Sequence, residues 1–289
     1  MGKVTYVFPG QGKKFGRTEL ELLKRNSDVL ERADEILGYS VAEMIQNKPG
    51  KLTKTEYAQP VGFLTNCLYY RELIGKEGKE PDFVIGHSLG ELSALTAGGY
   101  MDLEKGLALV QKRGRVMAEA DGGCMLAVMG KSYDEIMAAI KDAASDEIDI
   151  ANYNSPFQIV ISGPESAIDE AEKEISTRAL RTVRLKVSGA FHSRYMRRAC
   201  DEFKKAVLDF SFDKGNEVKV MSSVEPLLYR ENVPEILGEQ IVKPVRWIES
   251  IESLIDMDSY DFVQVDGGHT MIDMIDNIKF ARALRGRQG

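Results

Sequence analysis

Apolar and polar positions along this chain follow strand-like and helix-like patterns in turn. Residues 3–8 form a short apolar run, which predicts a buried strand that ends in a Pro-Gly-Gln-Gly turn. Leucine and alanine then recur at helical spacing from Leu20 to Leu37, which predicts a helical run that Gly38 ends. The same criteria predict helices at 57–74, 89–97, 103–120 and 247–255, strands at 83–85, 218–221 and 262–265, and a C-terminal helix. Because strands separated by helices form parallel sheets covered on both faces, we expect an α/β fold.

The middle of the chain breaks this rhythm. Its patterns predict, in order, a strand at 125–129, a helix at 132–144, strands at 148–151 and 158–162, a helix at 165–176 and a strand at 182–187. This βαββαβ order is typical of the ferredoxin-like fold. We therefore expect a large domain of residues 1–122 and 190–289, with a ferredoxin-like subdomain of residues 123–189 inserted into it.

The strongest chemical signal is Gly86-His87-Ser88-Leu89-Gly90, a GxSxG motif between an apolar strand and a helix. This is the context of a nucleophile elbow, whose glycines permit a sharp turn that exposes the serine hydroxyl. The amide of Leu89 is then placed to stabilise an oxyanion. A serine that only caps the helix is the alternative, but the strand and helix around the motif favour Ser88 as a nucleophile.

A serine nucleophile needs a base, and the sequence has three histidines. His87 adjoins Ser88 on a tight turn, where neighbouring side chains diverge, so we expect a structural role for it. His192 follows the predicted insert, and His269 follows the last predicted strand. Both positions suit a catalytic histidine, and the pattern alone does not separate them.

Two further features have ordinary alternatives. The turn from Gly10 to Gly16 lies between a strand and a helix, as a dinucleotide-binding loop does, but its third glycine comes one residue too late for GxGxxG. We favour its use as a second glycine-rich turn whose backbone N–H completes an oxyanion hole. Arg113 and Arg115 lie on a charged predicted helix, and the sequence alone does not choose between them.

Composition excludes some classes of function. The chain has 38 basic and 45 acidic residues, a net charge of −7, which argues against broad nucleic-acid binding. Its three cysteines are far apart, which predicts neither a disulfide framework nor a zinc site, and no other pattern indicates a metal. We identify no signal peptide, and no apolar run approaches the roughly 20 residues of a membrane span. We therefore expect a cytoplasmic protein.

Several motifs in one order resemble those of malonyl-CoA:acyl-carrier-protein acyltransferases. They are Phe8-Pro9-Gly10-Gln11-Gly12, Gly86-His87-Ser88-Leu89-Gly90-Glu91, Lys112-Arg113-Gly114, Asn154-Ser155-Pro156, Ala190-Phe191-His192-Ser193 and Pro244-Val245-Arg246-Trp247. The resemblance runs almost end to end, and the segment from Val187 to Met196 is most similar to the free-standing acyltransferases that serve polyketide synthases. It implies an α/β-hydrolase-like large domain, a ferredoxin-like insert and an active site in the cleft between them.

The resemblance also implies residue roles. Ser88 is the expected nucleophile, His192 the expected base, and Arg113 the residue expected to bind the malonyl carboxylate. Gln240 matches the position that orients the histidine through its backbone carbonyl. Phe191 is similar to the residue of malonyl-selective members, where a bulky side chain crowds an α-methyl group. The remaining implied role, the oxyanion hole, belongs to the amides of Gln11 and Leu89.

Such an enzyme moves a malonyl group from malonyl-CoA to the phosphopantetheine thiol of an acyl carrier protein by a ping-pong mechanism, with no bound cofactor. We expect it to supply a polyketide synthase in trans, with malonyl-CoA and the carrier as partners and neither nucleic acid nor membrane. The alternatives are a transacylase of fatty-acid synthesis, an acyl-carrier-protein hydrolase of the same fold, and a non-catalytic binding module. Carriers of this kind are typically acidic, so basic residues around His192 predict electrostatic docking. These residues are Arg184, Lys186, Arg194, Arg197, Arg198, Lys204 and Lys205.

The sequence departs from the family pattern at three places. Gly12-Lys13-Lys14 stands where Gly-Ser-Gln is usual, and Ser222-Ser223-Val224 stands where Ser-Asn-Val is expected. The late Gly-Pro-Gly is Gly267-Gly268-His269, which puts an extra histidine near the family's site. We expect the first two to alter the cleft rim and the polar contacts near His192, and none removes a catalytic position.

Overall fold

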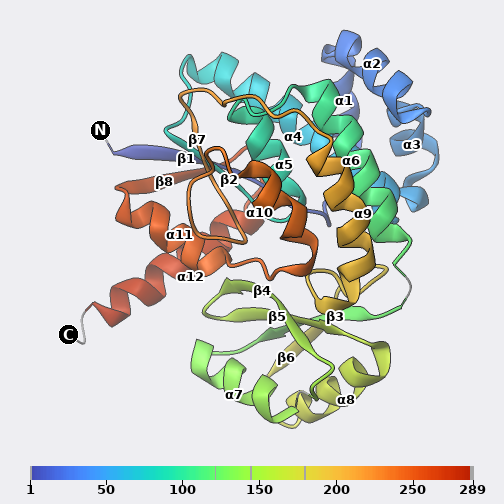
Figure 1. The fold of residues 1–289 in the computed structure, drawn as a ribbon. Helices are drawn as coiled ribbons and strands as arrows, with labels where there is room; N and C mark the ends of the chain where they lie inside the picture. Colours follow the sequence, from blue (N-terminus) through green and yellow to red (C-terminus); the bar gives the residue numbers. More distant parts are fainter. Residues whose placement is uncertain (1, 121, 144, 179, 287–289) are drawn as a thin grey trace.

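Two separate sheets organise the chain in this computed structural model, which describes residues 2–120, 122–143, 145–178 and 180–286 (Figure 1). The first sheet is parallel throughout. Its strands in spatial order are β7 (Lys219–Met221), β2 (Phe83–Gly86), β1 (Lys3–Phe8) and β8 (Ser259–Gln264). Phe8 is in register with Gly86, so the turns after β1 and β2 lie side by side at the carboxyl edge of the sheet.

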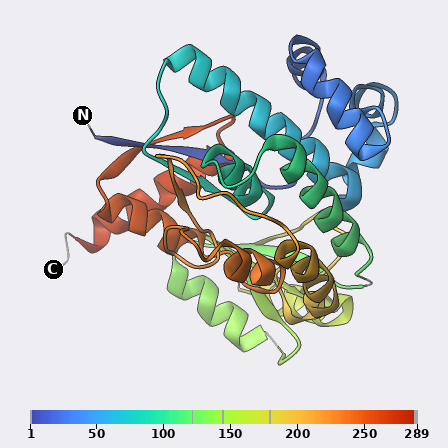
Figure 2. The ribbon, with the colours of Figure 1, turned by 45° about the horizontal axis from the view of Figure 1, so that its top comes forward.

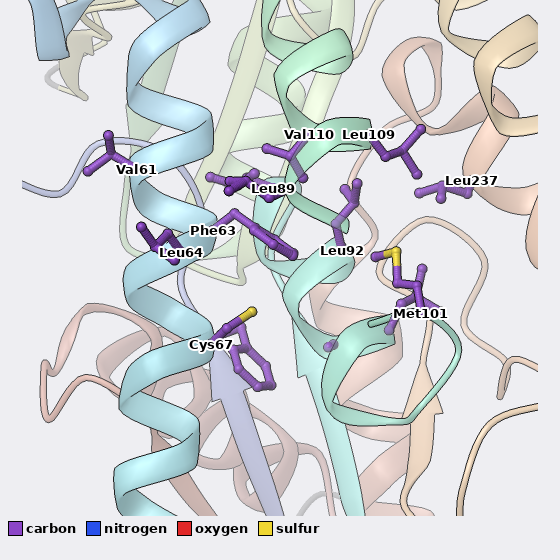
Figure 3. Close-up of a cluster of buried hydrophobic side chains, with 14 of the residues drawn as sticks. Val61, Phe63, Leu64, Cys67, Leu89, Leu92, Met101, Leu109, Val110 and Leu237 are labelled. Carbon is purple, nitrogen blue, oxygen red and sulfur yellow. The ribbon is translucent and has the colours of Figure 1, made fainter. Parts of the chain in front are cut away.

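Helices bury both faces of this sheet. Alternate strand residues face opposite ways: Tyr6 and Phe8 join one apolar cluster, and Val7 joins another. The helices of the first cluster are α1 (Arg17–Arg25), α2 (Ser27–Leu37), α3 (Val41–Asn47), α4 (Thr55–Glu77), α5 (Leu89–Ala97), α6 (Leu103–Ala118), α9 (Arg197–Leu208) and α10 (Val233–Glu239). Those of the second cluster are α11 (Trp247–Asp256) and α12 (Thr270–Arg285). Figure 3 shows part of the first cluster, where Phe63 of α4 lies close to Leu89 and Leu92 of α5.

The helical run from Leu20 to Leu37 is not one helix. Asn26 ends α1 with non-helical backbone angles, and its side-chain amide donates to the carbonyl of Leu22, so α2 starts afresh at Ser27. The two short helices pack at the outer edge of the molecule, where they are drawn in blue in Figures 1 and 2. Within the described parts of the chain, no helix is long and apolar enough to cross a membrane.

The second sheet is antiparallel and forms the lower lobe in Figure 1. Its strands in spatial order are β4 (Asp149–Ser155), β5 (Gln158–Gly163), β3 (Cys124–Met129) and β6 (Arg181–Arg184). The helices α7 (Tyr133–Ala143) and α8 (Glu165–Ser176) cover its far face and bury aliphatic side chains against it. This confirms the predicted α/β fold with a ferredoxin-like βαββαβ lobe. Ala144, the last residue of the predicted helix, lies outside the described residues.

Strand β6 is shorter than predicted. The amide of Leu185 still donates to the carbonyl of Met125 (2.9 Å), and the chain leaves the sheet after this residue. Leu185 and Val187 line the cavity described below. The lobes are also joined by backbone hydrogen bonds: Val245 donates to Ala151 (2.8 Å), and Tyr153 donates to Val245 (2.8 Å). The domain limits at 122/123 and 189/190 stay a prediction.

Candidate active site

The turn between β2 and α5 holds Ser88 in a strained conformation. Its φ is +51°, a value that non-glycine residues seldom adopt. The glycines on either side are required by close backbone approach. A Cβ on Gly86 would lie 1.9 Å from the carbonyl carbon of Gly90, and a Cβ on Gly90 would lie 2.2 Å from the carbonyl oxygen of Phe8. The predicted elbow geometry is therefore present, with the serine hydroxyl at the strand end.

Ser88 Oγ lies 2.8 Å from Nε2 of His192, so the structure brings together the two residues whose pairing the pattern alone had left open. The other ring nitrogen, Nδ1, faces two backbone carbonyl oxygens, Gln240 at 3.2 Å and Lys243 at 3.0 Å. Carbonyl oxygens only accept hydrogen bonds, so we assign the proton to Nδ1. Nε2 then carries the lone pair that can accept the serine proton.

The environment of His192 favours the neutral ring. Burial lowers the pKa of His192 to about 3, and the positive charge of Arg113 acts in the same direction, against weaker opposing contributions from the two carbonyls. The residue also has a positive φ of 58°, and its amide donates to the carbonyl of Ile241 at 3.0 Å. The chain between Gln240 and Lys243 thus holds both the backbone and the ring of the histidine.

Among the described residues, neither of the other two histidines is hydrogen-bonded to Ser88. His87 is bonded through Nε2 to Asn154 of β4 at 2.8 Å and packs its ring 5.3 Å from that of Trp247. Burial lowers its pKa, and Asn154 opposes this. His87 therefore links the elbow to the inserted lobe. His269 is exposed at the start of α12 and is not the histidine that contacts Ser88.

Gln11 and Leu89 lie on the two adjacent turns at the strand ends. The amide of His87 donates to the carbonyl of Phe8 at 3.0 Å, and Gly10 is so close to the elbow that a Cβ there would meet the His87 carbonyl oxygen at 2.7 Å. Leu89 is the first residue of α5, so its amide has no carbonyl acceptor inside the helix. Both Gln11 and Leu89 line the same cavity as Ser88. The glycine-rich turn after β1 therefore lies next to the elbow after β2, as its expected use in an oxyanion hole requires.

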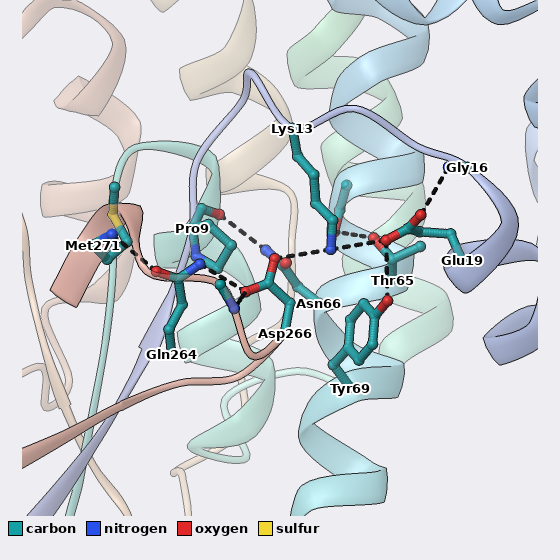
Figure 4. A network of polar contacts seen from close by, with 12 residues as sticks. Pro9, Lys13, Gly16, Glu19, Thr65, Asn66, Tyr69, Gln264, Asp266 and Met271 are labelled. Carbon is teal, nitrogen blue, oxygen red and sulfur yellow. Dashed lines mark hydrogen bonds and ion pairs between the residues drawn. The ribbon is translucent and has the colours of Figure 1, made fainter. Parts of the chain in front are cut away.

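The altered loop after Gln11 is fixed by Lys13 (Figure 4). Its ammonium lies 3.0 Å from Glu19 and 2.8 Å from Asp266, and 4.5 Å from the centre of the Tyr69 ring. Burial opposes the ionisation of Glu19, but the Gly16 amide and Lys13 outweigh it and lower the pKa of this carboxyl. Lys13 therefore ties the turn after β1 to the loop after β8.

Arg113 is completely buried on α6 and points at the elbow. Nη1 donates to Gln59 Oε1 at 2.7 Å, and Nη2 donates to Gln240 Oε1 at 2.8 Å and to Ser88 Oγ at 3.3 Å. Among the described residues, its Nε has no hydrogen-bond partner. Burial lowers the pKa of Arg113 to about 10, and Glu91 opposes this. Arg115 is exposed, so the structure separates the two arginines that the sequence could not.

These groups surround a cavity of about 90 Å³ between the lobes. The large lobe supplies Ser88, Arg113, Phe191 and His192, and the inserted lobe supplies Met125, among others. The further lining residues are Gln11, Gln59, His87, Leu89, Met117, Asn152, Leu185 and Val187. A serine hydroxyl, a histidine ring and a buried guanidinium therefore face one small space.

The sequence model described as the acyl transferase domain matches residues 5–276, nearly the whole chain. The chain belongs to this family of acyltransferases.

The acyltransferase is 40% identical to the polyketide biosynthesis malonyl CoA-acyl carrier protein transacylase PksC of Bacillus subtilis over 281 residues, 96% of this chain and 97% of that protein. A crystal structure of malonyl CoA-acyl carrier protein transacylase from Burkholderia pseudomallei superimposes with a TM-score of 0.90 at 34% identity, covering 96% of this chain and 98% of that one. A malonyl-transacylase in complex with a type II polyketide-synthase acyl-carrier protein gives a TM-score of 0.87 at 28% identity, covering 96% and 93%. The family resemblance drawn from the motifs is thus confirmed.

Sequence reasoning missed part of the acyltransferase site. Gln59 bonds Arg113 from the middle of α4, where its pattern is that of any helical glutamine. Lys243 contributes a backbone carbonyl, which no side-chain pattern reveals. No separate role was predicted for Glu91, because an acidic residue in the first turn of a helix is ordinary. Within the described residues, no group of three or more His, Cys, Asp or Glu could hold a metal ion.

Proposed function

We propose that this acyltransferase is a malonyl-CoA:acyl-carrier-protein S-malonyltransferase that acts through a malonyl ester on Ser88. The observation that carries the proposal is Arg113, a buried guanidinium in the wall of the cavity that contains the Ser88–His192 pair, whose Nε has no hydrogen-bond partner in the part of the chain that the structure describes. A carboxylate is the ligand that such a group pairs with most strongly. Malonyl is an acyl group that ends in a carboxylate, and relatives across nearly the full chain carry the name malonyl transacylase.

The first half-reaction forms the acyl-enzyme. Nε2 of His192 takes the proton of Ser88 Oγ while the oxygen attacks the thioester carbon of malonyl-CoA. The amides of Gln11 and Leu89 donate to the oxyanion, each worth about 3 kcal/mol. When the tetrahedral intermediate collapses, the C–S bond breaks and the imidazolium returns the proton to the coenzyme A sulfur.

The second half-reaction reverses these roles. His192 takes the proton of the phosphopantetheine thiol of the carrier, and the sulfur attacks the Ser88 ester carbon. The C–O bond then breaks, and the proton returns to Ser88 Oγ. In both half-reactions, every bond and proton is accounted for by Ser88, His192, the two thiols and the acyl group. The proposed reaction therefore needs no metal or resident cofactor.

The acyl group and its setting follow from the same residues and relatives. Phe191 lines the cavity next to His192, and its ring would crowd a substituent on the malonyl α-carbon. We propose that the enzyme supplies a polyketide synthase in trans, because relatives that it matches almost end to end are named for polyketide biosynthesis. We also propose the domain limits 1–122, 123–189 and 190–289, and a cytoplasmic location that suits the free thiols Cys67, Cys124 and Cys200.

Intact-mass measurement after mixing with malonyl-CoA tests the proposal. The expected result is a single malonyl adduct that persists without carrier and disappears when a phosphopantetheinylated carrier is added. Rapid conversion of malonyl-CoA to free malonate without a stable adduct would identify a hydrolase. No change in mass and no turnover would identify a binding module.

A further inference from the structure

A buried carboxylate, Glu91, lies behind the site and takes no part in the steps above. It is fully buried in the first turn of α5, three residues after Ser88. Its Oε1 accepts hydrogen bonds from the amide of Ser223 (3.0 Å) and the hydroxyl of Tyr229 (2.7 Å). Its Oε2 accepts from the hydroxyl of Ser223 (2.7 Å) and from Nε2 of Gln240 (2.6 Å). Four donors thus converge on one carboxylate, an arrangement that suits an ionised acceptor-only group.

The side-chain amide of Gln240 lies between this anion and the arginine. The amide oxygen only accepts and its nitrogen only donates, while the two ends are nearly equal in shape. A carboxylate on one side and a guanidinium on the other permit one orientation: Nε2 toward Glu91, and Oε1 toward Nη2 of Arg113 at 2.8 Å. In that orientation Nε2 also donates to the backbone carbonyl of Ser88 at 3.0 Å.

Gln240 also connects the Glu91–Arg113 network to His192. The backbone carbonyl of Gln240 lies 3.2 Å from Nδ1 of His192. Gln240 therefore contacts Glu91 and Arg113 with its side chain and His192 with its main chain. Ser223 also takes part in this network, because its amide and hydroxyl are two of the four donors to Glu91. This is the position where the sequence departs from the asparagine of the family pattern.

We propose that Glu91 is a positioning residue for malonyl recognition: it orients the Gln240 amide, which in turn holds the Arg113 guanidinium in the cavity wall. The inference rests on the proposed malonyl transfer. Glu91 is also the buried negative charge that counters the cost of burying Arg113. Because Gln240 separates the two charges, the carboxylate stabilises the arginine without occupying the hydrogen-bonding positions that a substrate carboxylate needs.

The test uses Glu91→Gln, which keeps the shape of the side chain and removes its charge. The new amide places an N–H₂ where only acceptors fit, so Gln240 loses its fixed orientation. We expect kcat/KM for malonyl-CoA to fall about 10- to 100-fold, the range of one charge-assisted hydrogen bond. Transfer from acetyl-CoA, which has no carboxylate for Arg113, falls much less, so the malonyl:acetyl ratio drops. A purely structural role would lower both rates by one common factor.

Tyr229→Phe is the matched control. It removes one donor to Glu91 but keeps the charge and the contact with Gln240, so we expect the malonyl:acetyl ratio to change by less than about threefold. Gln240→Met keeps the backbone carbonyl that faces His192 and removes the bridging amide. It should lower the ratio as Glu91→Gln does, and it keeps the test open if Glu91→Gln does not fold.

A double-mutant cycle tests the route through Gln240. In the Gln240→Met background, the added Glu91→Gln change should cost little further selectivity, because the bridge is already absent. Additive losses, or an unchanged ratio in Glu91→Gln, would overturn the inference. If the unaltered enzyme forms no malonyl adduct, the proposed function fails separately. The free energy of unfolding in the same cycle then still reports whether Glu91 and Gln240 are coupled.

Discussion

The buried arginine of the cavity and the exposed arginines have opposite surroundings. Arg184, Arg194 and Arg197 are close to His192 in the chain and exposed, and each forms an ion pair with a carboxylate, Glu172, Asp149 and Glu239 respectively. Arg113 is fully buried, yet every hydrogen-bond acceptor it has among the described residues is neutral. Among the described residues, the Glu91 carboxylate is connected to it through the side-chain amide of Gln240.

The difference shows where charge is available to a ligand. A surface cation that is already paired has little left to offer a partner, and exposed pairs contribute about 0–1 kcal/mol in any case. A buried guanidinium without a direct carboxylate has lost its hydration, and an anion that binds gives it a charged hydrogen-bond partner. The exposed arginines are therefore part of the surface of the folded protein, while we propose that the interior arginine selects the substrate.

The largest expected effect concerns the centre of the cleft. Ser88→Ala should abolish both the malonyl adduct and transfer, because no other hydroxyl lies against Nε2 of His192 in the described structure. Intact mass with malonyl-CoA measures the adduct, and a radiolabelled carrier assay measures transfer. Full adduct formation by this variant would place the reactive group outside the cleft and break the comparison.

Removal of the base should cost less than removal of the nucleophile. His192→Ala should lower kcat/KM by about 10² to 10⁴, the usual contribution of a positioned general base. His269→Ala should change it little, because His269 is exposed at the start of α12. Steady-state kinetics on both variants measure the difference. A larger loss in His269→Ala would show that the pairing of Ser88 with His192 does not describe the reactive state.

Substrate choice tests the interior arginine directly. Acetyl-CoA leaves Arg113 buried without an anionic partner, so discrimination against it comes from a penalty as well as from attraction to malonyl. We expect Arg113→Ala to lose about a hundredfold in malonyl kcat/KM and to gain activity toward acetyl-CoA relative to malonyl-CoA. Arg115→Ala is the matched control, since it removes an exposed arginine from the same helix. An Arg113→Ala enzyme that kept its malonyl preference would contradict the assignment.

The same variant should shift a titration. The charge of Arg113, after burial, lowers the pKa of His192, so its removal raises that pKa toward 6.5. The rate at which a neutral sulfonyl fluoride modifies Ser88 reports the base without the ionisation of a substrate. In the unaltered enzyme this rate should hold as pH falls below 6.5. In Arg113→Ala the acid limb of this rate should move to higher pH, and an unmoved limb would show that Arg113 does not act on the histidine.

How much was predictable depended on whether a feature is local in the chain. The elbow around Ser88 and the βαββαβ order follow from nearest-neighbour patterns, and both are present. The helical run that Gly38 ends is present, but it is divided at Asn26, where a side chain bonds to the backbone instead of continuing the helix; the apolar spacing did not predict this break. Glu91 and Lys243 act through contacts between segments far apart in the chain, so no local pattern shows their part in the site.

Substitutions at the carrier-docking surface should have the smallest effects on the rate of transfer. The ion pairs of the structure indicate which of the predicted basic residues are available to the carrier. Of the basic residues expected to attract an acidic carrier, Lys186 and Arg198 are exposed and form no salt bridge among the described residues, unlike Arg194, which pairs with Asp149. Transfer to the carrier should weaken with salt more than hydrolysis of malonyl-CoA does, because exposed charges are screened over about 8 Å at physiological ionic strength.

Within that dependence, Lys186→Ala and Arg198→Ala should each raise the KM for the carrier about two- to fivefold and leave the KM for malonyl-CoA unchanged. Arg194→Ala removes the same charge from a residue that is already paired, so it should change carrier KM less. Carrier kinetics at two salt concentrations separate these outcomes. An equal effect of all three substitutions would mean that net charge, and not the unpaired cations, attracts the carrier. Equal salt dependence of transfer and hydrolysis would remove the electrostatic account altogether.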